Sequence, residues 1–305
     1  MTPLNLSLLS RILTQPWAIR RDTLVSYTQG LLMPESLFSP AGQNRQRADS
    51  TFNVLQWDDA AQSSARKPLP TKPGYVVANY EGLIADRRGT LPDLPAGMTC
   101  VLMWGALGRG WTEIDRWYLD PIDVDEIVTA ISATAPGSTV VLWFRSPGGI
   151  VTGIPEAATA LRKLGVDRRL VAYSDECCAS AAYWLAAQCQ RITSAPTAEI
   201  GSIGVYLAFY DFVDYLAQRG VKLELFKAGD LKGLGVMGNP LDDAAREYLQ
   251  AGVVDAYRQF VTAVTEMRAM DAATMQGQTL RGKDAYKANL VDAFAPSFAD
   301  YLATL

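Results

Sequence analysis

Short apolar runs and stretches with apolar residues at helical spacing alternate along most of the chain. The run at 139–144 (TVVLWF) is continuous and rich in β-branched residues, which is typical of a strand buried on both faces of a parallel sheet. Further strand candidates are 75–80, 100–104, 170–173, 191–193, 205–209 and 221–226. Helical spacing occurs at 122–133, 154–164, 211–219 and 242–270. This alternation predicts an α/β fold with a mainly parallel sheet flanked by helices.

The N-terminal part has a different pattern. Residues 1–39 carry apolar positions at helical spacing, which predicts two short helices broken near Pro16. Residues 40–50 are polar and residues 66–74 (RKPLPTKPG) are rich in proline, which is typical of linkers. We therefore expect an N-terminal helical arm with a linker over 1–73 and one core domain over 74–305.

Composition narrows the class of protein. A chain of 305 residues with 49% apolar residues can bury one sizeable α/β core, and a net charge of −4 without a basic block argues against nucleic-acid binding. The start of the chain lacks the pattern of a signal peptide, and no window approaches the roughly 20 apolar residues of a membrane span. The four cysteines have no regular spacing, which indicates free thiols in a reducing compartment. We expect a soluble, cytoplasmic protein.

The chain contains no histidine, and this excludes whole classes of site. Serine–histidine and cysteine–histidine catalytic pairs are impossible, as are histidine-ligated metal sites. The cysteines also lack the CxxC spacing of a zinc site, so we expect no metal and no cofactor. A hydrolase built on this chain must take its base from a lysine, a carboxylate or an amino terminus.

Ser180 is the candidate nucleophile. It stands among Ala179, Ala181 and Ala182 and precedes an apolar run at 183–187, which predicts a buried helix that begins at the serine. Backbone N–H groups in a first helical turn are unpaired and the helix dipole is positive there, so an anion beside the serine is stabilised. A serine that merely caps the helix is the alternative.

Cys177 and Cys178 are rival nucleophiles in the same stretch. No histidine is available to activate either thiol, and buried cysteines usually act as small apolar residues. We therefore favour the serine.

A glycine-containing turn precedes Ser180 in the chain. Ser146, Pro147, Gly148 and Gly149 follow the buried run at 139–144 and precede a helix, and ligands of open α/β sheets bind beyond the carboxyl ends of strands. Two glycines there let backbone N–H groups face a substrate oxyanion. A tight turn without a ligand is the alternative. Ser146 is the weaker nucleophile candidate because Pro147 follows it.

Two lysines downstream are candidate bases. Lys227 and Lys232 flank the segment AGDL, and Lys232 lies in a glycine-containing loop that could fold over a site. A lysine acts as a base only when it is neutral, which requires burial or a nearby positive charge. A solvated surface charge is the alternative reading of each.

Four motifs in order resemble the signal peptide peptidase (SppA) family of serine–lysine peptidases. They are SPGG at 146–149, CASAAYWLAA at 178–187, TAEIGSIGV at 197–205 and FKAGDLK at 226–232. A weaker likeness extends over 75–291 and includes GKDAYKANLVD near its end. The resemblance implies a ClpP/crotonase-like fold and peptide-bond hydrolysis through an acyl-enzyme.

The resemblance also implies roles for particular residues. Ser180 matches the nucleophile, Lys232 the general base and Ser202 the hydroxyl that orients the lysine. Gly148, Gly149 and the N–H of Ala181 match the oxyanion hole.

The chain departs from the family pattern at two points. The family usually has glycines after the nucleophile, where this chain has Ala181 and Ala182, and an acidic residue often follows the lysine, where this chain has Gly233. We expect both changes to affect the substrate range more than the chemistry.

A narrower likeness is to the phage capsid-assembly members of this family. It suggests coat, portal or scaffold proteins as partners besides a polypeptide substrate, and the prohead as a possible place of action. The family assembles into rings or domes in which neighbouring subunits can supply the two dyad residues, so we expect a homo-oligomer. Two alternatives stay open: a catalytically idle capsid- or scaffold-associated module, and a crotonase-like acyl-CoA hydratase or isomerase.

Overall fold

A mainly parallel sheet forms the centre of the computed structural model, which describes residues 17–19, 75–77, 91–111 and 121–305. Its parallel core consists of β2 (Tyr75–Val77), β3 (Met98–Trp104), β6 (Thr139–Ser146) and β8 (Arg169–Ala179). Both β9 (Arg191–Ser194) and β10 (Glu199–Gly201) pair with β8 in parallel, β12 (Ala293–Phe294) extends β9, and β11 (Thr279–Leu280) is antiparallel to β10. The predicted α/β class with a mainly parallel sheet is confirmed.

A second, smaller sheet has the strand order β1-β7-β4-β5. It consists of β1 (Trp17–Ile19), β4 (Leu107–Gly108), β5 (Ile122–Asp123) and β7 (Gly148–Ile150). In this sheet β7 pairs with β4 in parallel on one side and with β1 antiparallel on the other. The glycine motif that the sequence suggested as a turn thus runs directly into a strand.

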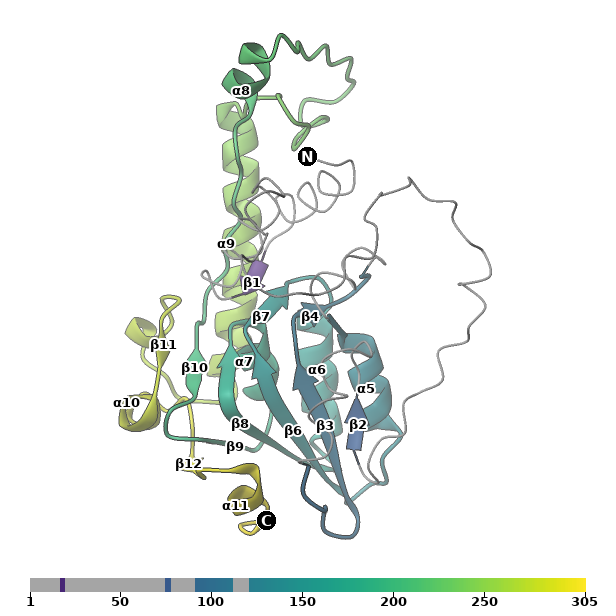
Figure 1. Ribbon diagram of the computed structural model, residues 1–305, viewed down its shortest axis with the longest axis vertical. Helices are drawn as coiled ribbons and strands as arrows, with labels where there is room; N and C mark the ends of the chain where they lie inside the picture. The colour runs from purple at the N-terminus through teal and green to yellow at the C-terminus, as the bar shows by residue number, and fades with distance from the viewer. Residues whose placement is uncertain (1–16, 20–74, 78–90, 112–120) are drawn as a thin grey trace, which may run out of the picture.

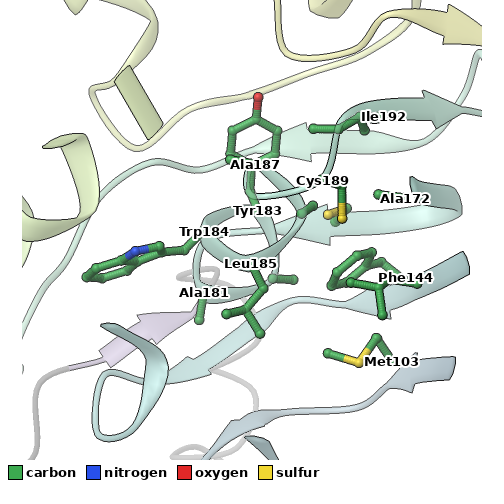
Figure 2. Close-up of a cluster of buried hydrophobic side chains, with 14 of the residues drawn as sticks. Met103, Phe144, Ala172, Ala181, Tyr183, Trp184, Leu185, Ala187, Cys189 and Ile192 are labelled. Atoms are coloured by element: carbon green, nitrogen blue, oxygen red, sulfur yellow. The ribbon is translucent and has the colours of Figure 1, made fainter. Parts of the chain in front are cut away.

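Helices cover one face of the large sheet (Figure 1). They are α5 (Val124–Ser132), α6 (Ile154–Leu164), α7 (Ala181–Ala186) and the lower half of α9 (Asp243–Thr265). Figure 2 shows Met103, Phe144 and Ala172, from three neighbouring strands, beside the side chains of α7. The apolar positions of these strands alternate between the two faces of the sheet, and the main core lies on this face.

An aromatic cluster covers the opposite face. Trp143 of β6 stacks on Phe298 of α11 (Phe298–Leu302) with ring centroids 3.9 Å apart, and Tyr173 of β8 stacks on Tyr301 at 4.9 Å. The run at 139–144 is continuously apolar because β6 is buried on both faces, as its sequence predicts.

Several predicted boundaries are right and others need correction. The helix predicted at 154–164 matches α6. The helix predicted at 242–270 is right at its start, where Asp242 caps α9 by accepting a hydrogen bond from the N–H of Ala245 at 2.7 Å, but α9 already ends at Thr265. The strand predicted at 170–173 continues to Ala179. Residues 122–133 begin with the two-residue strand β5 before α5. Two further short helices are α8 (Val213–Gln218), within the helix predicted at 211–219, and α10 (Gly282–Lys287).

The predictions of strands at 205–209 and 221–226 are wrong. Neither segment forms a strand, although residue 206 makes an isolated bridge. The second segment has the alternation of a strand but exposes Val221 and Leu223, and no neighbouring strand is paired with it. Local propensity does not make a strand without a partner strand.

The helices predicted within 1–39 and the linker segments at 40–50 and 66–74 lie outside the described residues, with the exception of β1. The domain boundary at 73/74 therefore stays a prediction. The strand predicted at 75–80 coincides with β2 over its described residues, 75–77.

One segment projects from the core. Residues 207–241, which we call the projecting arm, lie between β10 and α9 and include α8. Figure 1 shows this green segment running beside α9 to the helix end that lies farthest from the sheet. Most of its residues are exposed, including apolar ones such as Phe226.

Candidate active site

Ser180 occupies the junction between a strand and a helix. It follows the last residue of β8 and precedes the first residue of α7, with φ 56° and ψ −121° and only 1% of its surface exposed. A residue with a side chain in this backbone region costs about 1–3 kcal/mol, and such residues cluster at functional sites. Its N–H donates to the carbonyl of Gly201 at 2.7 Å, and its own carbonyl accepts from the N–H of Trp184 at 2.9 Å. These bonds hold the strained conformation.

Ser202 lies at the matching position of the neighbouring strand. In the parallel pair of β8 and β10, Gly201 is in register with Ala179, so Ser180 and Ser202 each come one residue after a paired position. Ser202 is also buried, has φ 53°, and donates its N–H to the carbonyl of Gln278 at 2.7 Å. The structure therefore brings the two serines to the same edge of the sheet. Within the described part of the chain, the hydrogen bond of the Ser180 hydroxyl is a long one, to the carbonyl of Gly204 at 3.4 Å.

The SPGG motif lies beside Ser180. Ser146 is in register with Cys178, two residues before Ser180, and β7 packs against α7. Gly149 must be glycine, because a Cβ there would lie 1.7 Å from the carbonyl oxygen of Leu107. The structure thus brings the predicted oxyanion loop to the predicted nucleophile.

Ser146 has a part in this loop that the sequence did not reveal. Its hydroxyl donates to the carbonyl of Gly105 at 2.6 Å and accepts from the N–H of Gly148 at 3.2 Å. The N–H of Gly148 is therefore already engaged within the loop. The only signal in the sequence was the position of Ser146 in the motif, two residues before Gly148.

The helix that follows Ser180 is held firmly. Ala181 and Ala182 have no exposed surface, the indole of Trp184 stacks on Phe260 of α9 at 4.5 Å, and the Tyr183 hydroxyl donates to the carbonyl of Leu290 at 3.1 Å. Figure 2 shows these side chains spreading from α7 in different directions into the core. A helix packed on all sides fixes the backbone N–H groups at its start, beside Ser180.

Of the two rival cysteines, Cys178 is disfavoured by its surroundings. Cys178 is buried, and burial raises the pKa of its thiol well above the ordinary value. Burial likewise raises the pKa of Cys189 to about 12. Because the thiolate is the nucleophilic form of cysteine, these thiols are unreactive near neutral pH.

The candidate lysines lie on the projecting arm, away from the sheet edge that carries Ser180. Lys232 is exposed on the projecting arm, where its N–H donates to the carbonyl of Gly229 at 3.1 Å, and Lys227 Nζ donates to the carbonyl of Asp230 at 2.8 Å. The arm reaches the far end of α9, whereas Ser180 lies at the sheet (Figure 1). The structure does not bring Lys232 to Ser180 within one chain.

The described residues contain neither a metal-binding cluster nor a helix that could span a membrane. Over 91–111 and 121–305, no group of three or more histidine, cysteine, aspartate or glutamate side chains is arranged to hold a metal ion. In the same part of the chain, no helix is both long enough and apolar enough to cross a bilayer.

Comparison with known proteins supports a peptidase. Residues 162–299 match the sequence profile described as Peptidase family S49. The chain is 30% identical over 181 residues to a putative protease of Methanocaldococcus jannaschii, covering 58% of this chain and 56% of that protein. It is 31% identical over 171 residues to the probable protease SohB of Buchnera aphidicola subsp. Schizaphis graminum, covering 55% and 50%. It is 30% identical over 165 residues to capsid assembly protease C of Escherichia phage lambda, covering 52% and 37%.

These matches confirm the resemblance to the SppA-type peptidases over the part of the chain that carries Ser180, Ser202 and Lys232. The chain spans about half the length of the first curated relatives it matches, 56% and 50%. Among solved structures, a mutant ClpP1 from Listeria monocytogenes matches with a TM-score of 0.40 and 11% identity, covering 66% of this chain and 93% of that one. A score at this level carries no weight for function.

Proposed function

We propose that this chain is a serine endopeptidase in which Ser180 is the nucleophile and Lys232 of a neighbouring subunit is the general base. The observation that carries the proposal is the strained, buried position of Ser180 between β8 and α7, beside the SPGG loop and, like Ser202, one residue beyond the pair of Ala179 and Gly201. A capping serine needs none of these three features, and Ser180 makes no capping hydrogen bond with its side chain.

The proposed reaction runs through an acyl-enzyme. Ser180 Oγ bonds to the scissile carbonyl carbon while its proton passes to the neutral lysine Nζ, which the Ser202 hydroxyl orients. The C–N bond then breaks as the lysine returns that proton to the leaving amine. Water next gives a proton to Nζ and attacks the ester, and Ser180 regains its proton as the acid leaves.

Backbone donors stabilise the oxyanion in this proposal. The N–H of Ala181, at the start of α7, and the N–H of Gly149 are the two donors. Gly148 has a supporting role, because its own N–H is donated to Ser146 Oγ and holds the turn in shape. This refines the oxyanion hole inferred from the sequence, which included Gly148 as a donor.

The projecting arm supports the assignment of the base to another subunit. Phe226, close in sequence to Lys232, is 91% exposed, and Val221 and Leu223 are 51% and 39% exposed. Apolar side chains gathered on one projecting segment are typical of a surface that a partner covers. In the proposed assembly each arm reaches the serine of the next subunit, and a heterologous contact of this kind forms a ring when its rotation closes. We therefore propose a homo-oligomer.

The proposed substrate is a polypeptide in extended form. The relative in phage lambda is named for capsid assembly, and on that likeness we propose capsid, portal or scaffold proteins as candidate partners. The cytoplasm, or a prohead if a phage encodes the chain, is the proposed place of action.

A catalytically idle module is the second candidate. The observation in its favour is the separation of Lys232 from Ser180 within one chain. An acyl-CoA enzyme has no specific observation to support it.

Labelling with a fluorophosphonate at pH 8 tests the proposal. The probe should attach to Ser180 in the wild-type oligomer, located by peptide mapping, and should fail to attach in Ser180→Ala and in Lys232→Ala. Circular dichroism and light scattering verify that both variants keep their fold and assembly. A folded wild-type oligomer that takes no label favours the idle module.

A further inference from the structure

A strand from the N-terminal part of the chain lies on the oxyanion loop. Residues Trp17–Ile19 form β1, which pairs antiparallel with β7. The register joins Trp17 to Ile150, Ala18 to Gly149 and Ile19 to Gly148. The partner of β1 is therefore the glycine strand beside Ser180.

β1 covers the edge of β7 that would otherwise be open to an added strand. The opposite edge of β7 is taken by β4, through the pair of Leu107 and Gly149. Both figures show β1, in purple, next to β7 near the start of α7. A peptide that adds to a sheet gains its affinity from main-chain hydrogen bonds along one free edge.

We propose that this edge of β7 is the binding strip for the substrate main chain and that Trp17–Ile19 is a built-in occupant of it. The inference rests on the proposed peptidase function. Ala18 is in register with Gly149, and in this proposal its carbonyl takes the place of the scissile carbonyl of a substrate. A substrate has to displace β1 before it can reach Ser180, and β1 acts as an intramolecular competitor.

The separation of Lys232 from Ser180 explains why β1 is not cleaved while it is paired with β7. Hydrolysis needs the lysine, which one chain does not bring to its own Ser180. Three paired residues bind weakly, because a short isolated strand pairing is marginal in water. β1 thus covers the edge of β7 in the free subunit, and a longer substrate displaces it.

Kinetics of the full-length chain test this proposal. In Ala18→Pro/Ile19→Pro, two adjacent prolines remove at least one N–H that faces β7, because successive N–H groups point to opposite sides of a strand. The matched control, Ala18→Ser/Ile19→Val, keeps every backbone donor. On a quenched fluorescent peptide, the proline variant should lower KM several-fold with kcat unchanged, and the control should behave as wild type.

A synthetic peptide of residues 14–23 (TQPWAIRRDT) supplies the second measurement. It should inhibit hydrolysis of the fluorescent peptide competitively, or be cut next to Ala18, and it should act more strongly on the proline variant than on wild type.

An unchanged or raised KM in the proline variant, with a peptide that neither inhibits nor is cut, would overturn the proposal. Fluorophosphonate labelling separates this failure from failure of the peptidase assignment, because the small probe reports on Ser180 whether or not β1 is paired.

Discussion

The surroundings of Ser180 and the projecting arm that carries Lys232 are opposites in construction. Ser180, Ala181 and Ser202 are buried, fixed by backbone hydrogen bonds and surrounded by the core. The arm at 207–241 is mostly exposed and displays apolar side chains. The proposed nucleophile therefore lies in a buried, preformed setting, whereas the segment that carries the proposed base exposes apolar side chains that a partner subunit could cover. If Lys232 of one subunit serves Ser180 of the next, as we propose, assembly is a requirement for catalysis.

The largest effect should come from removing either dyad residue. Ser180→Ala and Lys232→Ala should each lower kcat by roughly a thousandfold or more, because the two groups act as one unit and neither works alone. Peptide hydrolysis by the purified oligomers measures this. As a matched control, Lys227→Ala removes a nearby exposed lysine and should retain activity close to wild type. A fully active Lys232→Ala variant would show that the arm does not supply the catalytic base.

The next effect concerns the exposed apolar surface of the arm. Phe226→Asp should dissociate the oligomer and lower hydrolysis by roughly a hundredfold, since a charge in a buried interface is costly. The thermal stability of the monomer should change little, because Phe226 is 91% exposed in one chain. Sedimentation velocity and activity at matched concentration check both statements. An intact, active oligomer of this variant would show that the exposure of Phe226 has another cause.

A third prediction concerns Gly149, in the buried surroundings of Ser180. Gly149→Ala places a Cβ 1.7 Å from the carbonyl of Leu107, so β7 must shift and the oxyanion donor moves with it. Losing one such donor costs roughly a hundredfold in kcat. Gly252→Ala in α9 is the matched control, because nothing lies within 4 Å of the Cβ it adds. If both variants keep wild-type kcat, the SPGG loop has no part in catalysis.

The smallest effect concerns the pH dependence of stability. Burial of the Asp292 carboxyl is outweighed by hydrogen bonds from Arg268 and from the N–H of Ile192, so the pKa of Asp292 is lowered. Its contribution is then present above the unfolded pKa of about 4 and is lost as the pH falls through the lower folded value.

Asp292→Asn tests that statement. It leaves Arg268 buried without its charge partner; because the Asp292 side chain is 33% exposed and water screens part of the interaction, it should cost about 2 kcal/mol of unfolding free energy at pH 7. The difference from wild type should shrink toward pH 3. Urea denaturation at the two pH values provides the comparison, and a difference that stays constant with pH would contradict the assignment.

The sequence predicted the buried parts of the fold better than the exposed ones. The run at 139–144 and the helix at 154–164 were right, because burial on both faces or on one stripe leaves a clear apolar pattern. The end of β8 was missed, since Ser174, Asp175 and Glu176 are polar and only the neighbouring strands make them extended. The predictions of strands at 205–209 and 221–226 were wrong, since within the described residues these segments form no strand beyond the single bridge of residue 206, and an apolar pattern alone does not make a strand.

For the candidate site, the sequence motifs identified residues but not the strand pairing and hydrogen bonds that connect them. The motifs located Ser180, Ser202 and the glycine loop, which the structure brings together through strand register. Register and pairing cannot be seen in a motif, so the hydrogen bonds of Ser146 and the pairing of β1 with β7 were missed. The position of Lys232 depends on how the projecting arm packs, and in one chain most of this arm is exposed.

The most direct test of the central claim is complementation between two inactive variants. Equal amounts of Ser180→Ala and Lys232→Ala are dissociated, mixed and reassembled, and peptide hydrolysis is measured. If neighbouring subunits supply the two groups, random assembly restores about a quarter of wild-type activity, since one interface in about four then pairs an intact serine with an intact lysine. A mixed oligomer that forms and stays inactive would contradict the account.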